Sequence, residues 1–195
     1  MKRYFKNKKL LERNNIYSKD MEHDACGVGL VASTEGKKSR KVVEYGIQAL
    51  KAVWHRGAVD ADGKTGDGAG IHVEIPKEFF KEKIEVTGHV YDNSEICIGM
   101  IFLPRNNYEA QESCRTLVEK ELTQNDFNIY GWRQVPVNTK VLGEKAEQTR
   151  PEITQVLFRH NNQKLSGKSL EIKLYETRRK IENNVRQNHL DNFYI

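Results

Sequence analysis

The sequence predicts an α+β fold, because short apolar runs alternate along the chain with segments of helical periodicity. The apolar runs carry hydrophobic residues at consecutive positions, which is typical of strands that are buried on both faces of a sheet. The helical segments place apolar residues three and four positions apart. We therefore expect a sheet that is covered by helices on both of its faces.

The expected elements follow a polar and irregular stretch at residues 1–24. The patterns predict strands at 26–33, 71–76, 96–103, 127–137, 153–160 and 192–195, and helices at 40–55, 77–85, 106–123 and 169–187. The helix at 40–55 has the clearest periodicity, with Ile47, Leu50 and Trp54 along one stripe. We expect this helix and its neighbouring strands to be the best-ordered part of the chain, and the segment beyond residue 160 the least.

Composition and charge exclude several classes of protein. The 195 residues suit one domain or a large part of one, and the net charge is +5. Lys and Arg are spread along the chain rather than gathered in a block, so the charge does not indicate a nucleic-acid partner. The longest apolar run, 96–103, is far shorter than the roughly 20 residues that cross a bilayer. We expect neither nucleic-acid binding nor a membrane span.

The cysteines indicate a reducing compartment. The chain has three, Cys26, Cys97 and Cys114, and no C-x-x-C pair. An odd count without such a pair argues against both a disulfide framework and a zinc site. Residues 1–25 also lack the apolar centre of a secretory signal. We therefore expect a cytoplasmic protein with no bound metal.

Cys26 stands between two small residues at the start of the apolar run CGVGLVAS. One interpretation is a small hydrophobic residue buried in a strand. The other is a nucleophile: if residues 1–25 are removed, Cys26 becomes the first residue. Its α-amino group, with a pKa of about 8, is then the general base for its own thiol. This scheme requires no catalytic histidine, and none of the six histidines forms a Cys–His pattern.

The stretch HRGAVDADGKTGDGAG, residues 55–70, is a second candidate for a functional site. Its glycines from Gly63 to Gly70 predict left-handed backbone or close backbone approach. It does not match the full G-x-x-x-x-G-K-[ST] pattern of a P-loop, because Ala58 stands where the first glycine would be, and it lacks the final glutamate of an EF-hand loop. Arg56 has the chemistry to hold a carboxylate through two parallel hydrogen bonds, and a helix C-terminal charge is its other interpretation. A plain surface loop is the alternative for the whole stretch.

A dinucleotide-binding module is a further alternative, because GVGLVA at 27–32 has the G-x-G-x-x-A spacing. That motif belongs between a strand and a helix. Here the polar residues MEHD precede it, and the glycines lie within the predicted strand itself. The context argues against this alternative.

Four stretches together closely resemble the class II glutamine amidotransferase domain of glutamate synthase large subunits. They are DACGVGLVAS, GIQALKAVWHRGAVDADGKTGDGAGIHVEIPKEFF, VLGEKAEQTRPEITQV and LYETRRKIEN. The resemblance runs from about residue 22 to the end of the sequence. It implies the N-terminal-nucleophile hydrolase fold, a four-layer αββα sandwich. It also implies that residues 1–25 are a propeptide and that residues 26–195 are the N-terminal part of the amidotransferase domain.

The resemblance also implies roles for individual residues. Cys26 would attack the side-chain amide of the substrate glutamine, form a thioester and release ammonia, after which water frees glutamate. Arg56 would hold the α-carboxylate of glutamine. Gly66, Asp67 and Gly68 would shape the substrate site beside the nucleophile. The FMN and the iron–sulfur cluster of the full-length family enzyme would lie outside this segment.

The sequence departs from the family pattern in one respect. The family places its oxyanion-hole Asn-Gly pair, and an acid that binds the substrate amine, further along the chain, and this sequence contains no Asn-Gly dipeptide. We therefore expect an incomplete sandwich that lacks its C-terminal strands and has little or no activity alone. A separate chain that carries the rest of glutamate synthase would restore the missing parts. The alternative is a non-catalytic remnant of a split or decayed gene.

Overall fold

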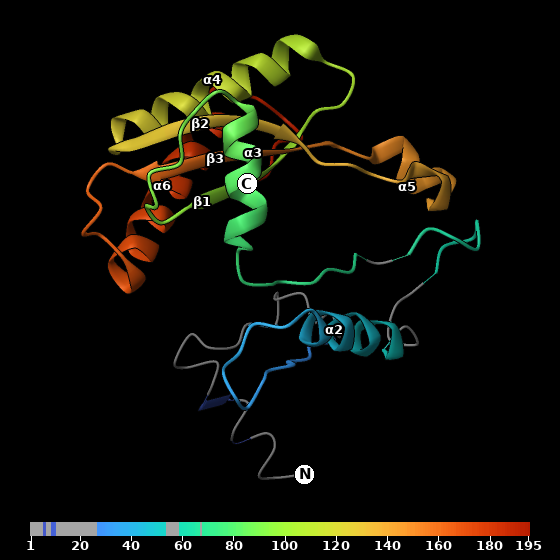
Figure 1. Cartoon of the computed structure of the whole chain (residues 1–195). Coiled ribbons are helices and arrows are strands. Elements are labelled where there is room, and N and C mark those ends of the chain that lie inside the picture. The colour runs from blue at the N-terminus through green and yellow to red at the C-terminus, as the bar shows by residue number, and fades with distance from the viewer. Residues whose placement is uncertain (1–5, 7–8, 11–26, 54–58, 67) are drawn as a thin grey trace. The chain divides into compact units, whose positions relative to one another are not determined.

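The computed structural model describes residues 6, 9–10, 27–53, 59–66 and 68–195 (Figure 1). The chain forms two compact units. The first comprises residues 1–58 and 67–71, and the second comprises residues 59–66 and 72–195. Helix α2 (Arg40–Ala52) belongs to the first unit, and the sheet belongs to the second.

The sheet of the second unit is antiparallel and has three strands among the described residues. The strands are β1 (Cys97–Leu103), β2 (Phe127–Gln134) and β3 (Glu152–His160), in the order β1-β3-β2. The register shifts between Ile129 and Gly131, which marks a β-bulge, and Gly131 has a φ of 147°. The strand predicted at 127–137 is therefore irregular at Gly131, and it ends at Gln134.

Helices cover both faces of this sheet (Figure 1). Helices α4 (Tyr108–Gln124) and α6 (Gly167–Gln187) lie on one face, and α3 (Lys77–Val86) lies on the other. The short helices η2 (Thr139–Val141) and α5 (Glu144–Thr149) lie between β2 and β3 in the sequence. Helix α4 begins where the Asn107 side chain accepts a hydrogen bond from the Ala110 N–H at 3.0 Å.

Two apolar clusters fill the spaces between sheet and helices. The buried residues of the larger cluster, under α4 and α6, are Cys97, Ile101, Leu103, Cys114, Val118, Leu122, Phe127, Val156, Phe158, Leu170, Ile181 and Val185. Those of the smaller cluster, under α3, are Phe80, Ile84, Ile96, Tyr130 and Leu157. Each large apolar side chain buried in this way contributes about 1.5–3 kcal/mol. The alternation of Val156, Leu157 and Phe158 between the two clusters is the two-residue repeat of a strand.

The α+β class and most of the predicted elements of the second unit are confirmed. Two predicted strands are wrong: residues 27–33 and 71–76 have no regular secondary structure. A strand requires a partner for its backbone groups, and the described residues offer these segments none. Val28 and Leu30 are accordingly exposed rather than buried. Apolar runs alone do not establish that a partner strand exists.

The two helices with clear apolar periodicity differ in how far they are buried. The helix predicted at 40–55 ends as α2 at Ala52, and it contains no buried residue. Helix α6, in the segment expected to be least ordered, contributes four buried residues to the second unit. The sequence pattern identified both helices, but amphipathic spacing does not indicate how much of the apolar face is covered.

Candidate functional site

Only two of the five predicted site residues, Gly66 and Gly68, lie among the described residues. Cys26, Arg56 and Asp67 lie outside the described residues. Gly66 is described and forms an isolated antiparallel bridge with Val59. Gly68 is exposed, and a Cβ added to it would meet no atom within 4 Å. The described part of the glycine-rich stretch next to these residues is the loop at residues 59–66.

This loop is closed by backbone hydrogen bonds. The N–H of Asp60 donates to the Thr65 carbonyl at 2.7 Å, and the N–H of Gly63 donates to the Asp60 carbonyl at 2.9 Å. Gly63 has a φ of +68°, which glycine adopts without strain. Among the four glycines expected to need such backbone, it is the only described one with a positive φ. The sequence predicted left-handed backbone or close backbone approach at these glycines, and Gly68 and Gly70 show neither.

The Asp62 carboxylate organises the tip of the loop. Its Oδ1 accepts hydrogen bonds from the N–H groups of Lys64 at 2.9 Å and Thr65 at 2.7 Å, and its Oδ2 accepts one from the Thr65 hydroxyl at 2.5 Å. These bonds, with the Thr65 hydroxyl the largest contributor, hold the pKa of the Asp62 carboxyl well below its usual range. The Asp62 carboxylate at the tip of the loop is therefore negatively charged at neutral pH.

A distant segment anchors this loop within the second unit. The Lys145 Nζ donates to both carboxylate oxygens of Asp60 at 2.7 Å, and the Ala146 N–H donates to the Thr65 hydroxyl at 3.4 Å. Gly143 lies so close that a Cβ there would be 2.2 Å from the Thr65 Oγ1 and 2.5 Å from the Thr65 N. Only glycine fits against a backbone atom at that distance.

Sequence analysis did not predict that Gly143, Lys145 and Ala146 contact this loop. They lie in the stretch VLGEKAEQTRPEITQV, which was noted only for its resemblance to the family. The one signal in the sequence is Gly143 itself, because a glycine can mark the close approach of another segment.

The two described cysteines are not candidates for a nucleophile. Both are buried in the larger apolar cluster and neither forms a disulfide. Burial raises the pKa of the Cys97 thiol to about 12 and also raises the pKa of the Cys114 thiol. Because the thiolate is the reactive form, both side chains are inert near neutral pH. Cys26 is the third cysteine of the chain.

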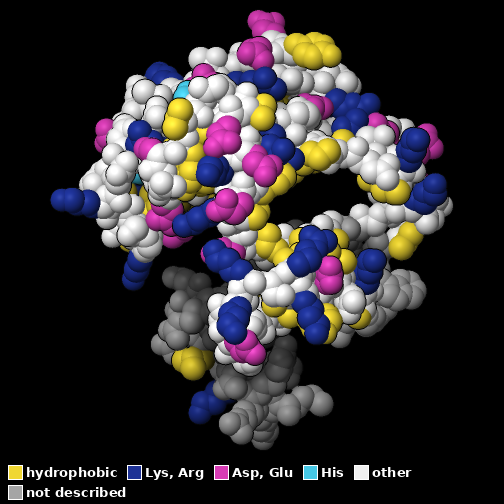
Figure 2. All heavy atoms as spheres, in the orientation of Figure 1, with side chains coloured by type: hydrophobic (Ala, Val, Ile, Leu, Met, Phe, Trp, Pro, Cys, Tyr) yellow, Lys and Arg dark blue, Asp and Glu magenta, His cyan; other side chains and the backbone are white. Residues whose placement is uncertain are grey.

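The described residues give no indication of a metal centre or a membrane span. No group of three or more His, Cys, Asp or Glu side chains in this part of the chain is placed to hold a metal ion. None of the described helices combines the length and apolar character that crossing a bilayer requires. Lys and Arg side chains are interspersed with Asp and Glu on the visible face (Figure 2), rather than gathered into the basic stripe of a nucleic-acid-binding protein.

Comparison with known proteins places the chain in a family. Residues 26–195 match the class II glutamine amidotransferases, and the match begins at Cys26. The NADPH-type glutamate synthase large chain of Azospirillum brasilense is 54% identical over 181 residues, which cover 93% of this chain. The ferredoxin-dependent glutamate synthase of Pyropia yezoensis is 35% identical over 96% of this chain. The NADPH-type large chain of Bacillus subtilis is 34% identical over 86% of it.

The chain spans about 12% of the length of these curated relatives. FMN and the iron–sulfur cluster belong to other regions of glutamate synthase, not to the amidotransferase domain. Because the family match covers most of the sequence, the chain belongs to the class II glutamine amidotransferases.

Proposed function

We propose that this chain supplies the glutamine-hydrolysing part of a glutamate synthase, with Cys26 as its nucleophile. The observation that carries the proposal is the family match to residues 26–195, whose first residue is Cys26. The buried state of Cys97 and Cys114 supports the same assignment, because their thiols are protonated near neutral pH.

The proposed reaction depends on removal of residues 1–25 as a propeptide. The freed α-amino group of Cys26 takes the thiol proton, and the sulfur adds to the side-chain amide carbon of glutamine. The proton then passes to the departing nitrogen, ammonia leaves, and a γ-glutamyl thioester remains. Water attacks the thioester, which releases glutamate and restores the thiol. Nucleophile and base belong to one residue, so no histidine takes part.

In this proposal the glycine-rich stretch binds the substrate. Arg56 holds the α-carboxylate of glutamine through paired hydrogen bonds, while Gly66, Asp67 and Gly68 form the wall beside the nucleophile. The anchoring of residues 59–66 by Lys145 and Gly143 supports this role, since a wall must be held in place to orient a substrate.

The complete domain in this proposal is a four-layer αββα sandwich, and residues 97–160 contribute three strands of one sheet. Further strands, the oxyanion hole and the acid for the substrate amine come from polypeptide beyond this chain, either joined to it or on a separate partner. The chain alone then hydrolyses little glutamine, because each oxyanion-hole donor contributes about 10²–10³-fold in rate. We place the reaction in the cytoplasm.

An electrophilic analogue of glutamine, with a diazoketone in place of the side-chain amide, tests this function. A chain produced with Cys26 as its first residue is incubated with the analogue, alone and with a polypeptide that carries the rest of a glutamate synthase. We expect mass spectrometry to find the label on Cys26 with the partner present, and excess glutamine but not asparagine to prevent it. No label on Cys26 in either sample would identify the chain as a non-catalytic remnant.

A further inference from the structure

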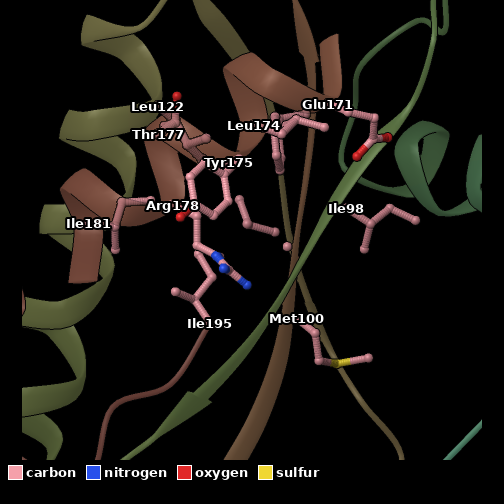
Figure 3. Close-up of a pocket in the computed structure, with 13 residues that line it drawn as sticks. Ile98, Met100, Leu122, Glu171, Leu174, Tyr175, Thr177, Arg178, Ile181 and Ile195 are labelled. Carbon is pink, nitrogen blue, oxygen red and sulfur yellow. The ribbon is translucent and has the colours of Figure 1, made fainter. Parts of the chain in front are cut away.

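Two cavities in the described part of the chain differ in the chemistry of their walls. The first, of about 330 Å³, lies between β1 and α6 and is lined mainly by apolar side chains such as Leu174 and Ile181 (Figure 3). Its arginine, Arg178, is already paired with the Glu182 carboxylate at 3.6 Å. The second, of about 380 Å³, lies between the first half of α4, the loop that follows β1, and the ends of β2 and β3. Polar and charged side chains line it, so its ligand would be recognised by charge.

Arg115, on α4, is the first cation of the second cavity. Its side chain is 29% exposed, and its Nε is buried without a hydrogen-bond partner among the described residues. The guanidinium stacks on the Trp132 ring, 5.5 Å from the ring centre, and its Nη1 lies 3.5 Å from the largely exposed Glu112 carboxylate. Arg115 is thus held by stacking, and its hydrogen-bond donors remain unused.

Arg105, in the loop that follows β1, is the second cation of this cavity. Its Nη1 donates to the Glu147 carbonyl at 2.8 Å and to the Glu147 carboxylate at 2.7 Å. These bonds fix the guanidinium beside α5. The Nε and Nη2 of Arg105 make no hydrogen bond to any residue that the structure describes, so the fixed side chain still has donors for a ligand.

Glu152, the first residue of β3, brings a carboxylate to the same cavity. Its Oε1 accepts a hydrogen bond from the Gln134 side-chain amide. Within the described residues no Lys, Arg or His pairs with Glu152, although two arginines line the same cavity. Opposite charges that share a cavity without pairing leave room for a molecule with the complementary charges.

We propose that this cavity binds an acidic α-amino acid, such as glutamate or aspartate. The charges that complement two guanidinium groups and one carboxylate are two carboxylates and one ammonium group, and an acidic α-amino acid carries this set on one small molecule. Its carboxylates bond to Arg105 and Arg115 through charge-assisted hydrogen bonds, and its ammonium group donates to Glu152.

A simple anion fits this cavity less well. Inorganic phosphate would bond to the two arginines, but the Glu152 carboxylate in the same cavity would repel it. Two more carboxylates lie nearby, and neither neutralises the site. Glu147 is shared between Arg105 and Arg150, and the Glu112 side chain is 71% exposed to water. The inference uses residues of the second unit alone and is independent of the proposed glutamine chemistry.

Titration of the full chain with L-glutamate at pH 7 tests the proposal. The readout is the NMR signal of the Arg115 Nε–H, which reports this cavity and no other binding site. Three analogues each lack one charge of the ligand: glutarate lacks the ammonium group, 4-aminobutyrate lacks the α-carboxylate, and L-glutamine lacks the side-chain carboxylate. The variant Glu152→Gln removes the acceptor for the ammonium group, and Arg186→Gln, at an exposed arginine of α6, is the matched control.

We expect L-glutamate to shift this signal with saturation at millimolar concentrations. Each analogue should bind at least about tenfold more weakly, because each loses a hydrogen bond between charged groups. Glu152→Gln should weaken L-glutamate binding by a similar factor and leave glutarate binding unchanged, while Arg186→Gln should bind as the parent chain does. Equal binding of glutarate and L-glutamate by the parent chain would overturn the proposal, and so would the absence of a saturable shift.

The amide signals of β3 show whether the sheet of each variant is intact. If Glu152→Gln does not fold, the comparison of the three analogues on the parent chain still decides the proposal. Inorganic phosphate is titrated in the same way, and binding as tight as that of L-glutamate would mean that the cavity is a plain anion site, which contradicts the proposal.

Discussion

Lys145 and Asp60 form an ion pair across 85 positions of sequence, with both carboxylate oxygens 2.7 Å from the Lys145 Nζ. The pair joins the glycine-rich loop to the short helix α5. The Lys145 side chain is 61% exposed, so water and salt screen the pair, and it contributes at most about 1 kcal/mol. The close approach of Gly143 to Thr65 is a second attachment of the loop.

The substitution Gly143→Ala tests this contact. Its methyl group would be 2.5 Å from the Thr65 N, so the loop must move, and we expect a loss of about 1–3 kcal/mol in the free energy of unfolding. Amide exchange of Lys64 and Thr65, whose N–H groups bond to Asp62, should accelerate at the same time. The matched control is Gly70→Ala, because a Cβ there meets no atom within 4 Å. Equal urea midpoints for the two variants would contradict this account of the loop.

A second pair of variants locates the core of the second unit on α6. Ile181 is 1% exposed and Ile172, on the same helix, is 51% exposed. We expect Ile181→Ala to lower the free energy of unfolding by about 2–5 kcal/mol, because it leaves a cavity. Ile172→Ala should change it by less than about 0.5 kcal/mol. Urea denaturation of both variants is the measurement, and similar losses would mean that α6 does not pack as described.

Thiol reactivity separates the three cysteines. We expect N-ethylmaleimide to modify Cys26 in the native chain and to leave Cys97 and Cys114 unmodified, since burial keeps their thiols protonated and covered. In guanidinium chloride all three should react. Peptide mapping by mass spectrometry identifies the modified cysteines. If Cys97 and Cys114 react in the native chain at the rate of Cys26, burial does not protect them, and their state no longer supports Cys26 as the nucleophile.

Asp92 makes the stability of the second unit depend on pH. A hydrogen bond from the Ser94 hydroxyl is the main cause that lowers the pKa of the Asp92 carboxyl, and the Tyr130 hydroxyl and the Arg159 guanidinium lower it further. Because the pKa is lower in the folded than in the unfolded chain, the stabilisation is present above the unfolded pKa. It is lost as the pH falls through the folded pKa.

We therefore expect Asp92→Asn to lower the free energy of unfolding by about 1 kcal/mol at pH 7. The difference in the free energy of unfolding between the variant and the parent chain should shrink as the pH falls below the usual pKa of 3.8 for this side chain. Urea unfolding of both chains between pH 7 and pH 3 measures this. A difference that stays constant over the range would show that the carboxylate charge of Asp92 does not stabilise the fold.

Sequence periodicity predicted the elements whose apolar positions are covered in the structure. Helices α4 and α6 and strands β1 and β3 lie close to the predicted ranges, because their spacing matches the two faces of one sheet. The segments at 26–33 and 71–76 were predicted as strands, and nothing in the pattern of their apolar residues reveals whether a partner backbone is present. A sequence pattern indicates the local preference of a segment for a strand. Whether that strand is paired depends on the rest of the fold.

The candidate site was predicted from local sequence patterns and from the resemblance to the family. Cys26 and Arg56 were singled out by their neighbours in the sequence, and they lie outside the described residues. The contact of the loop with Gly143 and Lys145 joins positions about 80 residues apart, so no local pattern could contain it. Gly63 was expected to adopt left-handed backbone, and the structure agrees at that position.

The most direct test of the central claim is the intact mass of the chain purified from its native source. If Cys26 is the nucleophile and its own amine is the base, the mass will correspond to a polypeptide that begins at Cys26, with residues 1–25 removed. If the mass still includes Met1 or Lys2, the amine base does not exist, and the mechanism proposed for this chain is contradicted.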